Sequence, residues 1–162
     1  MQSKLIAAFS AALVLAITAA GVAAAPAGAT KHAATVAKAG AKVTVRSSRY
    51  GKVLFDGRGY ALYLFTADRT TRSTCYGGCA KAWPPFLTKG EPVAGPGVHA
   101  GLFGTTRRRD GSLQVTYAGH PLYYYKGDGK DKGDGKGQTK CQNVSNFGGL
   151  WLVVTPIGKA VR

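Results

Sequence analysis

The sequence predicts an all-β, or at least β-rich, fold: a small pseudo-symmetric domain of two β-hairpin repeats, with a short helical turn near a Cys-x3-Cys segment. Three observations support this prediction. From Val43 onward, β-branched and aromatic runs are broken by glycines and an Asp-Gly pair, a pattern typical of short strands and tight turns. The chain also matches itself at an offset of 60 residues. With 162 residues, 45% of them hydrophobic, it can form one core but not several domains.

Residues 1–29 are predicted to be a signal peptide. Lys4 precedes an apolar stretch that ends in small residues, which is the order found in secretory leaders. Cleavage after Ala29 is favoured, because the earlier small-residue site would place Pro26 directly after the cut. An uncleaved anchor is the alternative, since no charge lies between Lys4 and Lys31. After cleavage, the sequence contains no second candidate for a membrane span.

The mature chain is expected to begin with a flexible basic arm, residues 30–42, which is rich in Ala and Lys and lacks aromatic residues. A single β-rich domain then covers residues 43–162, with repeats at 43–102 and 103–162. Without gaps, Val43–Asp68 aligns on Phe103–Asp128. Six aligned pairs are identical: Arg49/Arg109, Gly51/Gly111, Gly59/Gly119, Leu62/Leu122, Tyr63/Tyr123 and Asp68/Asp128. Apolar positions such as Phe55 and Val115 agree as well. Two copies predict a pseudo-symmetric domain rather than a solenoid.

Each repeat is expected to fold as strand, tight turn, strand, turn, strand. The first turns are placed at Tyr50-Gly51 and at Asp110-Gly111, the second pair being a strong hairpin signal. A tryptophan follows each unit, Trp83 and then Trp151. One helical turn is predicted from Gly78 to Trp83, where two prolines end it. A late strand is expected over residues 150–155.

Four segments together resemble a known family: YALYLFTAD, STCYGGCAKAWPPF, GTTRRRDGSLQVTYAGHPLYYYKGD and GGLWLVV. They are similar to a secreted repeat family with a Y-x4-D motif, whose members are often bacterial lipoproteins of unknown function. The resemblance extends over about residues 43–156 and includes both motif copies. It implies a secreted protein and supplies no reaction. Because no cysteine lies near the predicted cleavage sites, the lipid anchor of the lipoprotein members is not expected here.

The two motif copies are Tyr63 with Asp68 and Tyr123 with Asp128. Residues five apart on a strand point to opposite faces, so each pair can meet only if the chain bends between them. One interpretation is structural, with a buried ring and a carboxylate that closes a turn through backbone NH groups. The other is a pair of symmetry-related ligand sites. The structural interpretation is favoured, because a repeated motif meets the same fold requirement twice.

Three cysteines suggest a disulfide in an exported protein. Cys75 and Cys79 are the candidate pair, since the glycines between them let the loop close. Cys141 is the remaining thiol; it could keep its thiol, replace one of the two, or bridge to another molecule. The alternatives are thiol redox chemistry, or a metal site formed by the three thiolates and His120.

The net charge of +15 allows two interpretations, an anionic partner or a basic solvated surface without a dedicated partner. Outside the cytoplasm, the abundant polyanions are cell-wall polymers and lipid headgroups, and no specific nucleic-acid contact is predicted. The candidate anion-binding residues are Arg107, Arg108, Arg109, Lys130, Lys132 and Lys136. Calcium is not favoured in the Gly-Asp-Lys segment 127–137, because lysines are interleaved with its acids and outnumber them once the adjacent Lys126 is counted.

A copper site depends on processing. If cleavage exposes Thr30, then its amine, two amide nitrogens and the imidazole of His32 could surround Cu(II) in a square plane, with Lys31 between them. No firm metal site or cofactor is otherwise predicted. The sequence contains no catalytic serine motif, HExxH or phosphate loop, so catalysis has no support. We therefore expect a monomeric, secreted, non-catalytic binding protein, with an extracytoplasmic metal- or thiol-dependent redox protein as the alternative.

Overall fold

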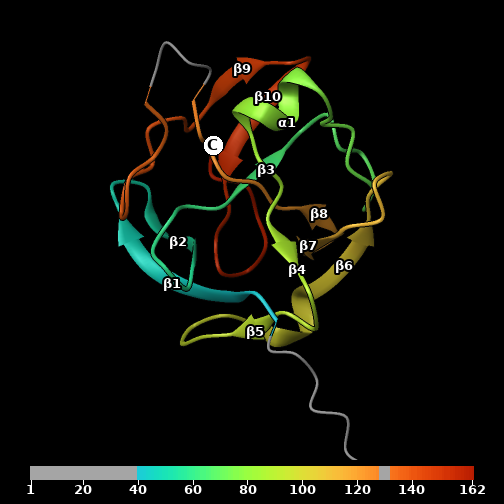
Figure 1. Ribbon diagram of the computed structural model, residues 1–162. Coiled ribbons are helices and arrows are strands. Elements are labelled where there is room, and N and C mark those ends of the chain that lie inside the picture. Colours follow the sequence, from blue (N-terminus) through green and yellow to red (C-terminus); the bar gives the residue numbers. More distant parts are fainter. Residues whose placement is uncertain (1–39, 128–131) are drawn as a thin grey trace, which may run out of the picture. The chain divides into compact units, whose positions relative to one another are not determined.

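The computed structural model describes residues 40–127 and 132–162 (Figure 1). The predicted signal peptide and the site at Thr30–His32 lie outside the described residues. Within the described ranges the chain forms short strands, one α-helix and one 3-10 helix, in this order: β1 (Lys42–Ser48), β2 (Gly51–Asp56), β3 (Tyr63–Phe65), α1 (Gly78–Ala82), β4 (Leu87–Thr88), β5 (Val93–Ala94), η1 (Ala100–Leu102), β6 (Phe103–Arg107), β7 (Leu113–Tyr117), β8 (His120–Pro121), β9 (Val144–Asn146) and β10 (Gly149–Val153). Across residues 40–127 and 132–162 the fold is β-rich with a single short α-helix, as predicted. Because β1 begins at Lys42, the end of the segment expected to be an arm belongs to the first strand.

Each repeat opens with an antiparallel hairpin, but the two hairpin turns differ. β1 and β2 pair as far as Ser48 and Gly51, which leaves a two-residue turn, Arg49-Tyr50, directly before Gly51 at φ 84°. β6 and β7 pair as far as Arg107 and Leu113, so the second turn is longer. The amide of Arg108 donates to the carbonyl of Ser112 within it, at 2.9 Å. The second turn contains Asp110-Gly111 as predicted, whereas the first lies one residue before the predicted Tyr50-Gly51, and only the first has the two-residue form.

The repeats are equivalent, with a shift of one residue inside the second strand. The amide of Leu62 donates to the carbonyl of Leu54, and the amide of Leu122 donates in the same way to that of Val115, each at 3.0 Å. Val115 therefore corresponds to Leu54 and not, as the gapless alignment predicted, to Phe55. The shift arises because the turn before Leu62 is one residue longer than the turn before Leu122.

Strands are exchanged between the repeats rather than kept within them. β10 of the second repeat pairs antiparallel with β3 of the first, and β4 of the first repeat pairs antiparallel with β7 of the second. At the centre, Tyr63 and Tyr123 exchange two backbone hydrogen bonds, each 2.9 Å long. A pseudo-twofold axis therefore passes between these two tyrosines.

Three aromatic rings form a stack across the same axis, and a fourth ring, tilted by 42°, covers one end of it. The rings of Trp83 and Trp151 lie parallel, with centroids 3.9 Å apart. Phe65 covers the far side of Trp151 at 4.1 Å, and Tyr125 covers Trp83 at 4.6 Å. All four side chains are buried, which makes this stack the centre of the core. Helix α1 ends directly before Trp83 and delivers it to the stack.

Candidate functional site

The repeated tyrosines and their carboxylate partners belong to opposite repeats. The hydroxyl of Tyr123 donates to Oδ2 of Asp68 at 2.5 Å. The hydroxyl of Tyr63 donates to Oδ2 of Asp134, also at 2.5 Å. Tyr63 and Asp68, which belong to one copy of the motif, thus each take a partner from the other repeat.

Each of these carboxylates also closes a loop. Oδ1 of Asp68 accepts hydrogen bonds from the amide of Thr74 at 2.7 Å and from its hydroxyl at 2.6 Å. Oδ1 of Asp134 accepts one from the amide of Lys140 at 2.8 Å. In both loops the acceptor and donor are six residues apart and a cysteine follows the donor. Asp128 lies outside the described residues, and Asp134 takes the position equivalent to Asp68.

Burial sets the proton affinities of these groups. The rings of Tyr63 and Tyr123 are 0% exposed. Burial and the negative charge of the nearby carboxylate both raise the pKa of each phenol, so both stay protonated as donors. Burial also raises the pKa of Asp134, although hydrogen bonds from Tyr63 and Lys140 act in the opposite direction. Since neither ring reaches solvent, these pairs present no open ligand site.

The three consecutive arginines are placed in different environments. Arg107 and Arg109 are exposed, whereas Arg108 is 5% exposed. The Arg108 guanidinium donates to Ser73 Oγ at 2.8 Å, to Gln114 Oε1 at 2.6 Å and to the carbonyl of Cys75 at 2.8 Å. The prediction that Arg108 binds an external anion is therefore wrong, because its guanidinium is buried and both Nη1 and Nη2 donate to groups inside the protein. Of the predicted lysines, Lys132 and Lys136 are exposed, and Lys130 lies outside the described residues.

The cysteines are arranged as the disulfide prediction expected. Cys75 and Cys79 are joined, and Cys141 is half-buried against the same core cluster. A metal site using all three thiolates and His120 is therefore wrong, because a disulfide removes two of the ligands. Across residues 40–127 and 132–162, no group of three or more His, Cys, Asp or Glu side chains could hold a metal ion.

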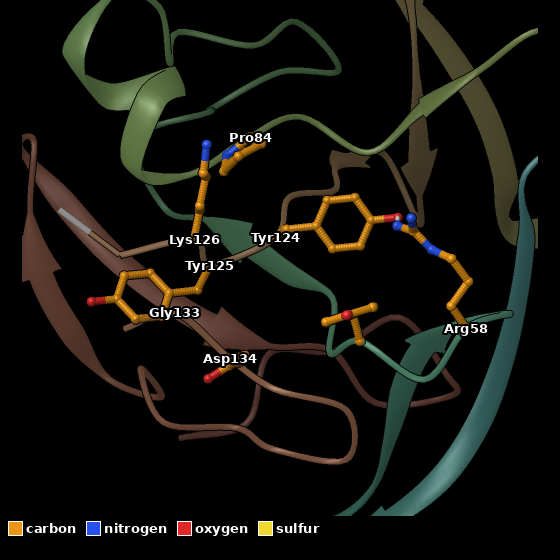
Figure 2. A pocket seen from close by; sticks show the side chains of 8 residues that line it. Arg58, Pro84, Tyr124, Tyr125, Lys126, Gly133 and Asp134 are labelled. Carbon is orange, nitrogen blue, oxygen red and sulfur yellow. Dashed lines mark hydrogen bonds between the residues drawn. The ribbon is translucent and has the colours of Figure 1, made fainter. Parts of the chain in front are cut away.

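A surface cleft of about 310 Å³ lies beside the Tyr63–Asp134 pair (Figure 2). We call it the tyrosine cleft. Its lining residues are Arg58, Tyr60, Pro84, Tyr124, Tyr125, Lys126, Gly133 and Asp134. Figure 2 shows the Tyr124 side chain reaching across the cleft toward Arg58, with Lys126 on the other side. None of the residues that were predicted from the sequence to be functional lines this cleft.

A buried carboxylate fixes one wall of the tyrosine cleft. Asp56 accepts from Nε of Arg58 at 2.8 Å and from the hydroxyl of Tyr124 at 2.9 Å. It also accepts from the amides of Arg58 and Tyr60. Burial alone would raise the pKa of Asp56, but the hydrogen bonds from Tyr60, Arg58 and Tyr124 outweigh it and lower that pKa. The sequence signal for this wall is an Asp that begins the Asp56-Gly57-Arg58 turn and can accept hydrogen bonds from the turn's own NH groups.

In the part of the chain that the structure describes, no helix is long and apolar enough to cross a membrane. No curated protein and no solved structure matches the chain. One family model, described as a secreted repeat of unknown function, matches residues 44–86 and 104–155. These two regions start within β1 and β6, so they correspond to the two repeats, and together they cover more than half of the chain. The chain therefore belongs to this family of secreted repeats of unknown function.

Proposed function

We propose that this protein is a secreted, non-catalytic binding protein that attaches to anionic material of the cell envelope. The observation that carries the proposal is the imbalance of charge at the surface. Among the described residues, seventeen lysines and arginines are exposed, whereas Glu91 and Asp110 are the only exposed carboxylates. Asp56, Asp68 and Asp134 are buried as hydrogen-bond acceptors. The outer surface is therefore more uniformly cationic than the composition alone indicates.

The exposed cations come from several separate elements. Lys42 and Arg46 lie on β1, and Arg107 lies at the end of β6. Arg72 and Lys136 lie on the loops that follow the repeated strands. A positive field spread over many elements favours an extended polyanion, which contacts many of them at once, over a single small anion.

Co-sedimentation with isolated cell walls of the host tests the proposal. We expect the purified mature protein to sediment with the walls at low ionic strength. Release should follow as salt rises from about 0.05 M to about 1 M, because the screening length falls to roughly 3 Å at 1 M. Anionic phosphatidylglycerol vesicles, run in parallel, separate wall polymers from lipid headgroups as the binding material. Absence of retention, or retention that salt does not change, would contradict the proposal.

A thiol-dependent redox function is the second candidate, and one observation favours it. Cys79 lines a surface hollow of about 560 Å³ together with Phe65, Tyr76 and Phe147. However, Cys75 and Cys79 are only 1% and 7% exposed. Counting alkylatable thiols after incubation in glutathione buffers of graded potential distinguishes the two functions. A binding protein should keep two cysteines oxidised throughout, whereas a redox protein should exchange them reversibly.

A further inference from the structure

The tyrosine cleft is small and has a preformed wall. Its volume of about 310 Å³ is at the lower end of the range for small-molecule sites, about 300–1,000 Å³. It can therefore hold one small unit of a polymer rather than an extended segment. Much of its lining is aromatic, from Tyr60, Tyr124 and Tyr125, and its cations are Arg58 and Lys126.

Arg58 is held in place while its guanidinium stays accessible. Its side chain is 68% exposed, yet Nε is bonded to the buried carboxylate of Asp56. Nη2 donates to the hydroxyl of Tyr124 at 3.2 Å. The guanidinium carbon also lies 5.3 Å from the centre of the Tyr60 ring and 5.7 Å from that of Tyr124. An arginine oriented in this way loses less conformational entropy when it binds an anion than a mobile surface lysine does.

The two tyrosines beside Arg58 form an apolar corner. The rings of Tyr60 and Tyr124 are nearly perpendicular, at 87°, and their centroids lie 6.4 Å apart. Both side chains are half-buried, so part of each ring remains available to a ligand. The C–H face of a sugar ring is apolar and flat enough to pack against such an aromatic surface.

The charged groups lie on either side of this corner. Figure 2 shows Arg58 and Lys126 on opposite sides of the Tyr124 ring. Asp134 also lines the cleft, but it is buried and both its oxygens accept hydrogen bonds, from Tyr63 and from the amide of Lys140. The accessible charge of the cleft is therefore cationic.

We propose that the tyrosine cleft binds one carboxylate- or phosphate-bearing sugar unit. The sugar ring packs against Tyr60 and Tyr124, and its anionic group binds Arg58 or Lys126. This inference rests on the proposed function and sharpens it: the distributed surface charge attracts the polymer, and the cleft selects a sugar unit within it.

NMR titration of the isotope-labelled protein tests the inference with three probes. Trigalacturonate carries sugar rings and carboxylates, glucose 6-phosphate carries a sugar ring and a phosphate, and tripolyphosphate carries charge without a sugar. We expect at least one sugar acid or sugar phosphate to shift the amides of Tyr60, Tyr124 and Lys126. Tripolyphosphate should instead shift amides across the basic surface.

Two variants and a matched control report on affinity for the sugar probe. Arg58→Gln should raise the dissociation constant about tenfold, by removing a charge-assisted hydrogen-bond donor. Tyr60→Ala should raise it about fivefold to tenfold, by removing one aromatic face. Tyr60→Ala keeps the two hydrogen bonds that the backbone of residue 60 makes with Asp56. This variant therefore remains informative if Arg58→Gln fails to fold. Lys52→Gln removes one exposed charge from β2 and should change the constant less than about threefold.

The outcomes separate this inference from the proposed function. Two results would contradict sugar binding in the tyrosine cleft and leave wall attachment by charge alone. One is an equal loss of affinity for the sugar probe in Lys52→Gln and in the cleft variants. The other is tripolyphosphate binding as tightly as both sugar probes. Failure of both sugar probes to shift the cleft amides would overturn sugar binding in the cleft as well. Sugar binding in the cleft together with salt-independent wall retention would overturn the proposed function and support the cleft.

Discussion

The two buried Tyr–Asp pairs occupy equivalent places about the pseudo-twofold axis, but their surroundings differ. Asp68 accepts hydrogen bonds from Tyr123 and from both the amide and the hydroxyl of Thr74. The Tyr123 hydroxyl is also hydrogen-bonded to Ser73 Oγ at 2.7 Å, and Arg108 donates to the same Oγ. This pair therefore belongs to a buried network that reaches the disulfide loop.

The second pair is supported mainly by backbone groups. Asp134 accepts from the hydroxyl of Tyr63 and from the amide of Lys140. The Arg49 side chain reaches the loop of this pair, and its Nη2 donates to the carbonyl of Thr139 at a longer 3.4 Å. The comparison teaches that the tyrosine, the carboxylate and the amide six residues after it are common to both repeats, whereas the side chains around them are specific to each. Such a shared element fits a role in joining the repeats.

The largest effect is expected at the centre, where the repeats are most alike. Trp83→Ala and Trp151→Ala should each lower the free energy of unfolding by about 3–5 kcal/mol, because each removes half of the stacked pair and leaves a cavity. Urea denaturation followed by circular dichroism measures both. Trp→Phe at each position is the matched control and should cost less. A difference of several kcal/mol between the two alanine variants would contradict the equivalence of the two repeats at the centre of the core.

An intermediate effect should distinguish the two carboxylates. Asp68→Asn removes an acceptor that serves three hydrogen bonds and should cost about 2–4 kcal/mol. Asp134→Asn affects two hydrogen bonds, and burial already disfavours the charge of Asp134, so about 1–2 kcal/mol is expected. The same urea denaturation ranks them. A larger loss for Asp134→Asn would show that the surrounding network does not set the difference.

The smallest effect is a pH dependence of opposite sign at Asp56 and Asp134. The pKa of Asp56 is lowered from 3.8, so its ionised form stabilises the fold above about pH 3.8, and this contribution is lost as pH falls through the lowered value. The pKa of Asp134 is raised from 3.8, so its contribution is present below about pH 3.8 and is lost as pH rises through the raised value.

Unfolding free energies measured between about pH 3 and pH 6 test this difference. The cost of Asp56→Asn should grow as pH rises over this range, whereas the cost of Asp134→Asn should shrink. Parallel slopes for the two variants would contradict the opposite environments assigned to these carboxylates.

The local features of the fold were predictable because their causes are local. Gly51 and Gly111 both have positive φ, at 84° and 81°; Gly51 directly follows the first hairpin turn and Gly111 lies in the second. The Cys75–Cys79 disulfide closes a short loop whose two glycines are visible in the sequence. The helical turn that ends at two prolines follows from the same kind of evidence.

The exchange of partners between repeats was not predictable from spacing. A repeat shows which residues are equivalent but not which copy each residue contacts. The Gly-Asp-Lys segment also offers Gly-Asp pairs at both Asp128 and Asp134, and a gapless alignment selects the first. The signal that would have identified Asp134 is a cysteine seven residues further on, the spacing also found between Asp68 and Cys75. Similarly, successive residues of a strand point to opposite faces, and this alternation could have predicted that Arg108 is buried while Arg107 and Arg109 are exposed.

The most direct test of the exchange between repeats is a set of double-mutant cycles in unfolding free energy. The cycles combine Tyr123→Phe with Asp68→Asn, Tyr63→Phe with Asp134→Asn, and, within one motif copy, Tyr63→Phe with Asp68→Asn. Coupling of about 0.5–3 kcal/mol is expected for the first two pairs, which are in contact, and little or none for the third. Strong coupling between Tyr63 and Asp68, with none across the repeats, would contradict the account.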